Sequence, residues 1–264
     1  MEEKRENKKG QITIFVIIAL ILVVTLALVF VLIKTPSTGI SADKPDTSKS
    51  YITKCARDAL SEAESLVIPH GGFLDTSTTN FVRYSGRDVL WLCYTSDYET
   101  KCRNKHPMLQ QEIERQLENY VKPKIEECFS TMKTQLRNYD YKDEPLYLDI
   151  KIIPTKTYMN ITKKISYKIN EQTINIEKFD SSINSPLYDF VSIANEISNQ
   201  ELRNCNCIDA CNADIFELNR LNPAFAIRKP AVGGDGEEVY TITEISSGKE
   251  FDLAIRNCVD KIMT

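Results

Sequence analysis

The spacing of apolar and polar residues changes twice along the chain. Residues 12–33 are apolar on every face and contain no charge, glycine or proline. Residues 50–68 and 107–138 carry apolar residues at the spacing of an amphipathic helix. Apolar and polar residues then alternate with a period of two over 146–153, 157–169 and 173–179. This order predicts an apolar helix, a helical part and an antiparallel sheet with one wet face.

Further elements complete the prediction of an α+β fold. Ser85-Gly86 is a short turn signal, and it predicts a hairpin over 80–95. Pro123 should kink or divide the helix over 107–138. The remaining pattern predicts helices over 186–203 and 208–220, a strand over 224–229, and a hairpin of 238–245 with 250–257. The residues expected to point inward there are Ile208, Ile215, Phe216, Leu218, Tyr240, Ile242, Phe251, Leu253 and Ile255.

Changes in composition predict how the chain is divided. Residues 35–49 are rich in Pro, Ser, Thr and Asp and are expected to form a flexible tether, with the next helix beginning at Ser50. The expected segments are a basic cytoplasmic tail (1–10), a transmembrane helix (11–34), the tether (35–49), a mainly helical subdomain with a hairpin (50–140) and an antiparallel α+β subdomain (141–264).

The apolar run is long enough to anchor the chain in a lipid bilayer. As a helix, residues 12–33 would rise about 33 Å, which matches a bilayer core of about 30 Å. No small-x-small site follows the run, so an uncleaved single-pass anchor is favoured over a cleaved secretory signal. Cations, among them Lys8 and Lys9, precede the run, which predicts a cytoplasmic N-terminus and an extracytoplasmic C-terminal region.

The junction Lys8-Lys9-Gly10-Gln11 resembles the class III signal peptide of archaeal type IV pilin-like precursors. That resemblance implies cleavage between Gly10 and Gln11, although Phe15 stands where such chains usually carry a glutamate. A plain anchor that happens to begin with this motif is favoured over a processed pilin-like chain. The N-terminus and the cysteine-bearing helices behind it also resemble single-anchor membrane proteins of small-genome archaea, which implies a lineage and a topology.

The cysteines point to an oxidising compartment. All eight lie after the anchor, namely Cys55, Cys93, Cys102, Cys128, Cys205, Cys207, Cys211 and Cys258. An even number in an exported region is typical of disulfides. Cys55 and Cys128 lie on two apolar helix stripes and are predicted to bond, and Cys93 with Cys102 should close a short loop. Pairing among the last four stays open, with Cys207–Cys258 weakly favoured and a zinc site as the alternative.

Charge and motifs exclude several functions. The net charge of −4 argues against nucleic acid as a partner. No motif of a phosphate loop, a metalloprotease or a serine hydrolase occurs, and no catalytic residue, cofactor or metal ligand is predicted. His70 and His106 lie at helix boundaries, where capping or solvation is expected. Asn160-Ile161-Thr162 is a possible glycosylation site on an exposed strand position.

The function expected from these features is interaction rather than catalysis. The chain should be a membrane-anchored, disulfide-stapled protein of the cell envelope, whose partners are the bilayer through residues 11–34 and other envelope proteins. A type IV pilin-like subunit is the first alternative, and an exported enzyme of unknown reaction is the second.

Overall fold

A computed structural model describes residues 18, 20–23, 45–74, 81–135, 144–169, 172–204, 213–230 and 237–258. The expected tail (1–10), most of the expected anchor (11–34), residues 35–44 of the tether and most of the 140–145 boundary lie outside these residues. Ile18 and residues 20–23 have helical backbone. Within the described ranges, no helix is both long enough and apolar enough to span a membrane.

Residues 42–264 form one compact unit. Its first element is helix α2 (Pro45–Val67), which begins at Pro45 rather than at Ser50. Residues 45–49 therefore belong to a helix and not to the tether, and this expectation is corrected. Proline suits the first turn of a helix because that turn needs no backbone donor. Ile52, Ala56 and Leu60 form a fully buried stripe, as the helical spacing predicts.

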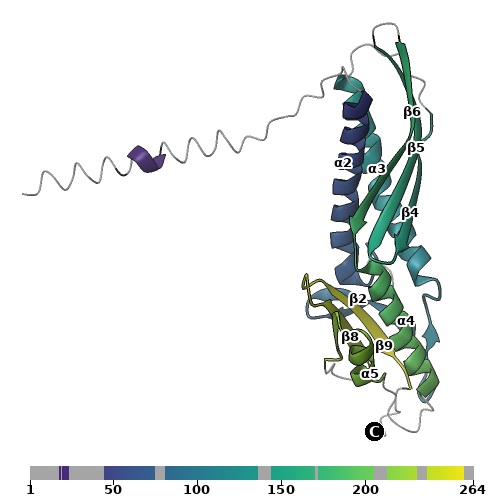
Figure 1. Cartoon of the computed structure of the whole chain (residues 1–264). Coiled ribbons are helices and arrows are strands. Elements are labelled where there is room, and N and C mark those ends of the chain that lie inside the picture. Colours follow the sequence, from purple (N-terminus) through teal and green to yellow (C-terminus); the bar gives the residue numbers. More distant parts are fainter. Residues whose placement is uncertain are drawn as a thin grey trace, which may run out of the picture. The chain divides into compact units, whose positions relative to one another are not determined.

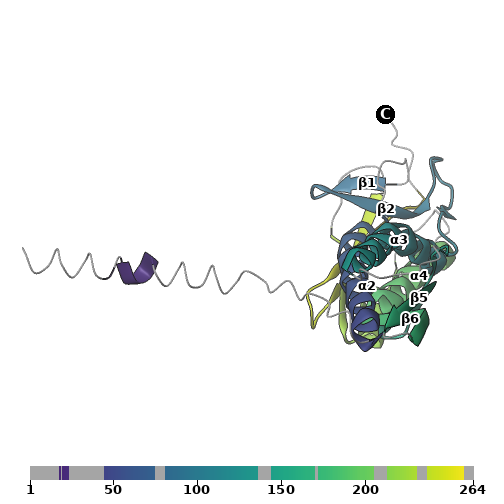
Figure 2. The same ribbon diagram turned by 90° about the horizontal axis from the view of Figure 1, so that it is seen from above.

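Helix α3 (Leu109–Gln135) lies beside α2 and continues through Pro123. The proline therefore does not divide the helix. Pro123 and Asn119 are exposed, so water can bind the Asn119 carbonyl that proline leaves without a partner. Figures 1 and 2 both show α2 and α3 side by side.

A three-stranded meander covers the two helices, as the alternation predicts. It consists of β4 (Tyr147–Ile153), β5 (Lys156–Ile169) and β6 (Gln172–Asn184), in the order β4-β5-β6. Both pairings are antiparallel, with Ile150 opposite Met159 and Ile161 opposite Phe179. These four side chains are buried on one face, and Phe129 of α3 packs edge-on against Phe179. The other face is open (Figure 1).

The second sheet joins strands from both ends of the unit. It contains β1 (Phe81–Tyr84), β2 (Arg87–Tyr94), β3 (Arg103–Asn104), β7 (Phe225–Arg228), β8 (Glu237–Glu244) and β9 (Glu250–Arg256). The strand order is β1-β2-β9-β8-β7, and β3 pairs with β2 outside this order. The expected β1–β2 and β8–β9 hairpins are present. The sequence did not predict that these hairpins share one sheet, in which β2 and β9 pair in parallel, with Leu90 opposite Leu253.

Two helices complete the unit. Helix α4 (Leu187–Asn204) buries Phe190, whose ring stacks on Phe251 and meets Phe225 edge-on. Helix α5 (Ile215–Leu221) is shorter than expected, because Asp214 caps it by accepting a hydrogen bond from the Glu217 amide.

Of the residues expected to point inward in α5, Leu218 is buried but Phe216 is 80% exposed, so that part of the prediction is wrong. Ile208 lies outside the described ranges. The inward residues predicted for β8 and β9 are all buried.

A short helical turn connects α2 to the second sheet. The turn η1 (Ile68–His70) ends at Gly71 and Gly72, whose φ angles are 65° and 98°. A Cβ at Gly72 would lie 2.3 Å from Ile113 of α3. Only glycine fits here, because the backbone passes against α3 in a left-handed conformation.

Candidate functional site

Both disulfides predicted within the described ranges are present. Cys55 of α2 bonds to Cys128 of α3, with a Cα–Cα distance of 6.4 Å and a sequence separation of 73. Cys93 of β2 bonds to Cys102 with a Cα–Cα distance of 5.5 Å. The first bond ties the two long helices together, and the second closes the loop between β2 and β3.

The remaining cysteines are less fully placed. Cys258, directly after β9, is also disulfide-bonded. Cys205, Cys207 and Cys211 lie outside the described residues, and so do Gly10 and Gln11 of the predicted processing site. In the part of the chain that the structure describes, no three His, Cys, Asp or Glu side chains converge as a metal site would require.

Asn160 lies on the open face of the three-stranded sheet. It is exposed on the central strand β5, opposite Asp149 of β4 and Asp180 of β6. Its Oδ1 accepts a hydrogen bond from the Tyr158 hydroxyl at 3.0 Å, which leaves the amide nitrogen turned to solvent. A glycan at this position would cover the middle of the face.

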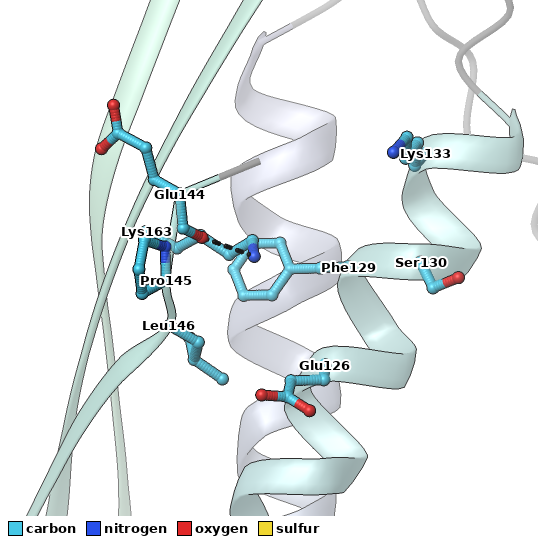
Figure 3. Close-up of a pocket in the computed structure, with 8 residues that line it drawn as sticks. All are labelled: Glu126, Phe129, Ser130, Lys133, Glu144, Pro145, Leu146 and Lys163. Carbon is cyan, nitrogen blue, oxygen red and sulfur yellow. Dashed lines mark hydrogen bonds between the residues drawn. The ribbon is translucent and has the colours of Figure 1, made fainter. Parts of the chain in front are cut away.

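A hollow of about 460 Å³ lies between α3, the three residues that precede β4, and β5 (Figure 3). Lys163 of β5 is its central group, and this side chain is 8% exposed. Its ammonium donates to the Glu144 carbonyl at 3.0 Å and lies 5.6 Å from the centre of the Phe129 ring. The residues around the hollow are Glu126, Phe129, Ser130, Lys133, Glu144, Pro145, Leu146 and Lys163.

The chemistry of this hollow favours structure over reaction. The Lys163 ammonium is held by a carbonyl and an aromatic face, which fixes a buried cation at the helix–sheet junction. Ser130 is the only hydroxyl among the lining side chains, and the lining has neither histidine nor cysteine.

A buried carboxylate connects four segments near the end of α4. Glu201 is fully buried, and its Oε1 accepts hydrogen bonds from the Tyr240 hydroxyl and from the Ala213 amide, the latter at 2.8 Å. Asn257 donates to the Glu201 carbonyl at 3.0 Å and accepts from the Cys102 amide at 2.8 Å. This cluster, the Glu201 cluster, joins α4, the start of the α5 segment, β8 and the residue before Cys258.

Burial perturbs the titration of two groups in and beside this cluster. Burial raises the pKa of Glu238, and the nearby Glu201 charge adds to the effect. Lys229 opposes that shift, because its ammonium lies 2.5 Å from Glu238 Oε1. Burial and the two carboxylates together raise the pKa of Tyr240 strongly. Tyr240 therefore stays protonated and acts as a hydrogen-bond donor.

A second buried carboxylate lies within the six-stranded sheet. Asp252 of β9 is fully buried and accepts a hydrogen bond from the Thr241 hydroxyl at 2.7 Å. Arg87 of β2 lies 3.1 Å from its other oxygen. Burial raises the pKa of Asp252, while Thr241 and Arg87 oppose the shift. These contacts connect three neighbouring strands and leave no group placed to react with a ligand.

Three side chains of α3 bind the outer edge of β4. Glu114 Oε1 accepts from the Ile152 amide at 3.0 Å, and Glu118 Oε1 accepts from the Ile150 amide at 3.0 Å. Gln110 donates to the Ile152 carbonyl at 3.0 Å. The helix thus supplies the hydrogen bonds that a further strand would make. The i, i+4, i+8 spacing of these polar residues was a usable signal that the sequence analysis did not include.

The two histidines are structural. His70 ends η1, and its Nδ1 lies 3.1 Å from the Asp88 carbonyl. His106 is 6% exposed, packs edge-on against Phe73 and lies 2.6 Å from Glu112. The expectation that boundary histidines are capping or solvated is therefore wrong for His106.

Comparisons with protein-family models, curated proteins and solved structures find no match to this chain.

Proposed function

We propose that this chain is a membrane-tethered, extracytoplasmic protein of the cell envelope that acts by binding other envelope components. The observation that carries the proposal is the distribution of the cysteines. All eight follow the apolar segment, and the five in the described ranges are disulfide-bonded. Structural disulfides persist in oxidising compartments and are rare in the cytosol.

The open face of the three-stranded sheet is the surface proposed for binding. Tyr147 is 67% exposed and Ile153 is 42% exposed, and they flank the Asp149–Lys151 ion pair on β4. Aromatic side chains among paired charges are typical of protein interfaces rather than of catalytic clefts. The edge beside this face is blocked by α3, so a partner would bind the face and not extend the sheet through β4.

Topology gives the direct test. In intact cells, an impermeant amine-reactive label should modify Lys156, which is exposed at the start of β5, and should spare Lys8 and Lys9 until the cells are permeabilised. Labelling of Lys8 and Lys9 with protection of Lys156 would overturn the proposal. Alkylation without reductant should leave the cysteines of the isolated protein unmodified.

The motif Lys8-Lys9-Gly10-Gln11 supports the pilin-like subunit as a second candidate. Cleavage between Gly10 and Gln11 would free the apolar segment to assemble with other copies. The mass of the mature N-terminus separates the two proposals, because a chain that begins at Met1 is not processed. An exported enzyme is the third candidate, and accumulation of a substrate in a deletion strain would favour it.

A further inference from the structure

A basic hollow lies on the first turns of α2, away from the sites described above. Its volume is about 460 Å³. Among the described residues, it is lined by Lys49, Ser50, Thr53, Lys54 and Arg57, which bring three cations and two hydroxyls.

The helix places these groups on one stripe. Lys49, Thr53 and Arg57 follow one another at i, i+4 and i+8, which brings them onto the same side of α2. Ser50 and Lys54 flank them, while the buried stripe at Ile52 faces the sheet. The three cationic side chains belong to exposed residues, so their charged ends are accessible from solvent.

The cations of this stripe make no ion pair within the described ranges. No described carboxylate lies within 4.0 Å of Lys49, Lys54 or Arg57, although Asp58 follows on the same helix. Elsewhere on the helical pair a cation is matched, as Lys124 is by Glu62 at 2.9 Å. A cluster of like charges without a partner on a chain of net charge −4 is suited to an external anion.

The lining groups match a phosphate. Ammonium and guanidinium groups bind phosphate oxygens through charge-assisted hydrogen bonds, and hydroxyl groups complete the shell. We propose that this hollow binds the phosphates of anionic lipid headgroups in the membrane that anchors the chain. This inference rests on the proposed membrane tether.

Chain length makes this contact possible. The predicted membrane span ends at Lys34 and α2 begins at Pro45. The intervening peptide reaches about 40 Å at most when fully extended, so the tether keeps the start of α2 within that distance of the bilayer surface. Basic residues beside a membrane span bind anionic lipid surfaces.

The test uses the full chain reconstituted in nanodiscs, one set of phosphatidylcholine and one with added phosphatidylglycerol. Lysine reactivity toward a soluble amine probe is measured by mass spectrometry. Lys156 is the reference because it lies far from the hollow. Its neighbour Thr157 contacts Glu64, which lies about 22 Å along α2 from Lys49. In the anionic discs the reactivity of Lys49 and Lys54 relative to Lys156 should fall about fivefold or more. Salt at about 0.5 M should restore it.

Paired variants separate the hollow from general surface charge. In Lys49→Gln/Arg57→Gln, protection of the remaining reporter Lys54 should be lost. The matched variant Lys164→Gln/Lys178→Gln removes two exposed cations from the three-stranded sheet and should leave protection of Lys54 unchanged. Circular dichroism should show the same folded state for both variants.

Each other outcome contradicts a defined part of the inference. Equal reactivity of Lys54 in both disc types would overturn headgroup binding. Protection in phosphatidylcholine discs by inorganic phosphate alone would assign the hollow to a soluble anion instead. Failure of the chain to copurify with either disc would refute the membrane tether itself, which is a different result from insertion without protection.

Discussion

The three-stranded sheet β4-β5-β6 and the six-stranded sheet around β9 bury their polar groups by different means. In the first, side chains of α3 hydrogen-bond the outer edge of β4, and most of the charged residues described on its strands are exposed, with Lys163 the buried exception among them. In the second, Asp252 and Tyr240 are fully buried within the strands and need partners from neighbouring segments. The comparison shows that the first sheet pairs strands that follow one another in sequence, while the second joins strands from distant segments, as the parallel pairing of β2 with β9 does.

The largest expected effect comes from the two described disulfides, one beside each sheet. Removing Cys55–Cys128 by Cys55→Ala/Cys128→Ala should lower the free energy of unfolding by about 4 kcal/mol, because a long loop regains its freedom. Removing Cys93–Cys102 should lower the free energy of unfolding by less, about 3 kcal/mol, because the loop that this bond closes is shorter. Urea unfolding of both variants measures the difference, and a larger loss for Cys93–Cys102 would contradict the chain-entropy account.

The Glu201 cluster should dominate the stability of the six-stranded sheet. Glu201→Ala leaves the Ala213 amide without an acceptor and removes one of the two acceptors of the Tyr240 hydroxyl, the other being Glu238 Oε2 at 3.2 Å, and should cost about 3 kcal/mol in urea unfolding. Glu196→Ala on the same helix is the control, because Glu196 is partly exposed, and it should cost less than about 0.5 kcal/mol. Equal losses in the two variants would mean that burial of the cluster contributes nothing.

Loss of the α3 contacts to the β4 edge should lower the free energy of unfolding less than loss of the Glu201 contacts. It should instead have its larger effect on self-association of the protein. Glu114→Ala exposes the Ile152 amide and should cost about 2 kcal/mol. The freed edge should also make the protein self-associate at high concentration, which light scattering after gel filtration detects. Glu127→Ala, an exposed change on the same helix, should stay monodisperse at the same concentration. A monodisperse Glu114→Ala variant would refute the role in edge protection.

The smallest effect concerns pH. Because burial raises the pKa of Asp252 above its ordinary value of 3.8, the folded state holds this proton more tightly than the unfolded state. The contribution of this proton to the free energy of unfolding is fully present below pH 3.8. It is lost as the pH rises through the pKa that Asp252 has in the folded state. Asp252→Asn should flatten this decline in unfolding free energy. Asp149→Asn on the open sheet should leave it in place, since Asp149 is exposed. Identical pH profiles for Asp252→Asn and the unchanged chain would contradict the assignment.

Much of the fold follows from patterns that span only a few residues. The period of two in β4 and β5 and the Ser85-Gly86 turn are local, because they depend on neighbours two to four residues away. The Cys55–Cys128 bond was also predictable, since both cysteines lie on apolar stripes of helices that had to pack together. The start of α2 was misplaced because residues 45–49 share the composition of the expected tether, whereas proline is also favoured in the first turn of a helix.

The candidate sites were less predictable for a physical reason. The basic hollow on α2 needs the helix to begin before Lys49, and Glu201 is an ordinary helical residue until Tyr240 and Asn257 are placed beside it. Such sites are made by side chains that converge from separate elements, and no single stretch of sequence carries their spacing.

The sequence by itself determined the α+β class, the faces of the helices and strands, and the presence of cysteines only after the apolar segment. The tertiary structure decided the parallel pairing of β2 with β9, the blocked edge of β4 and the Glu201 cluster. Which face of a helix or strand is buried depends on the period at which apolar residues recur along that segment. The choice of partner depends instead on how surfaces far apart in sequence fit and satisfy each other's hydrogen bonds.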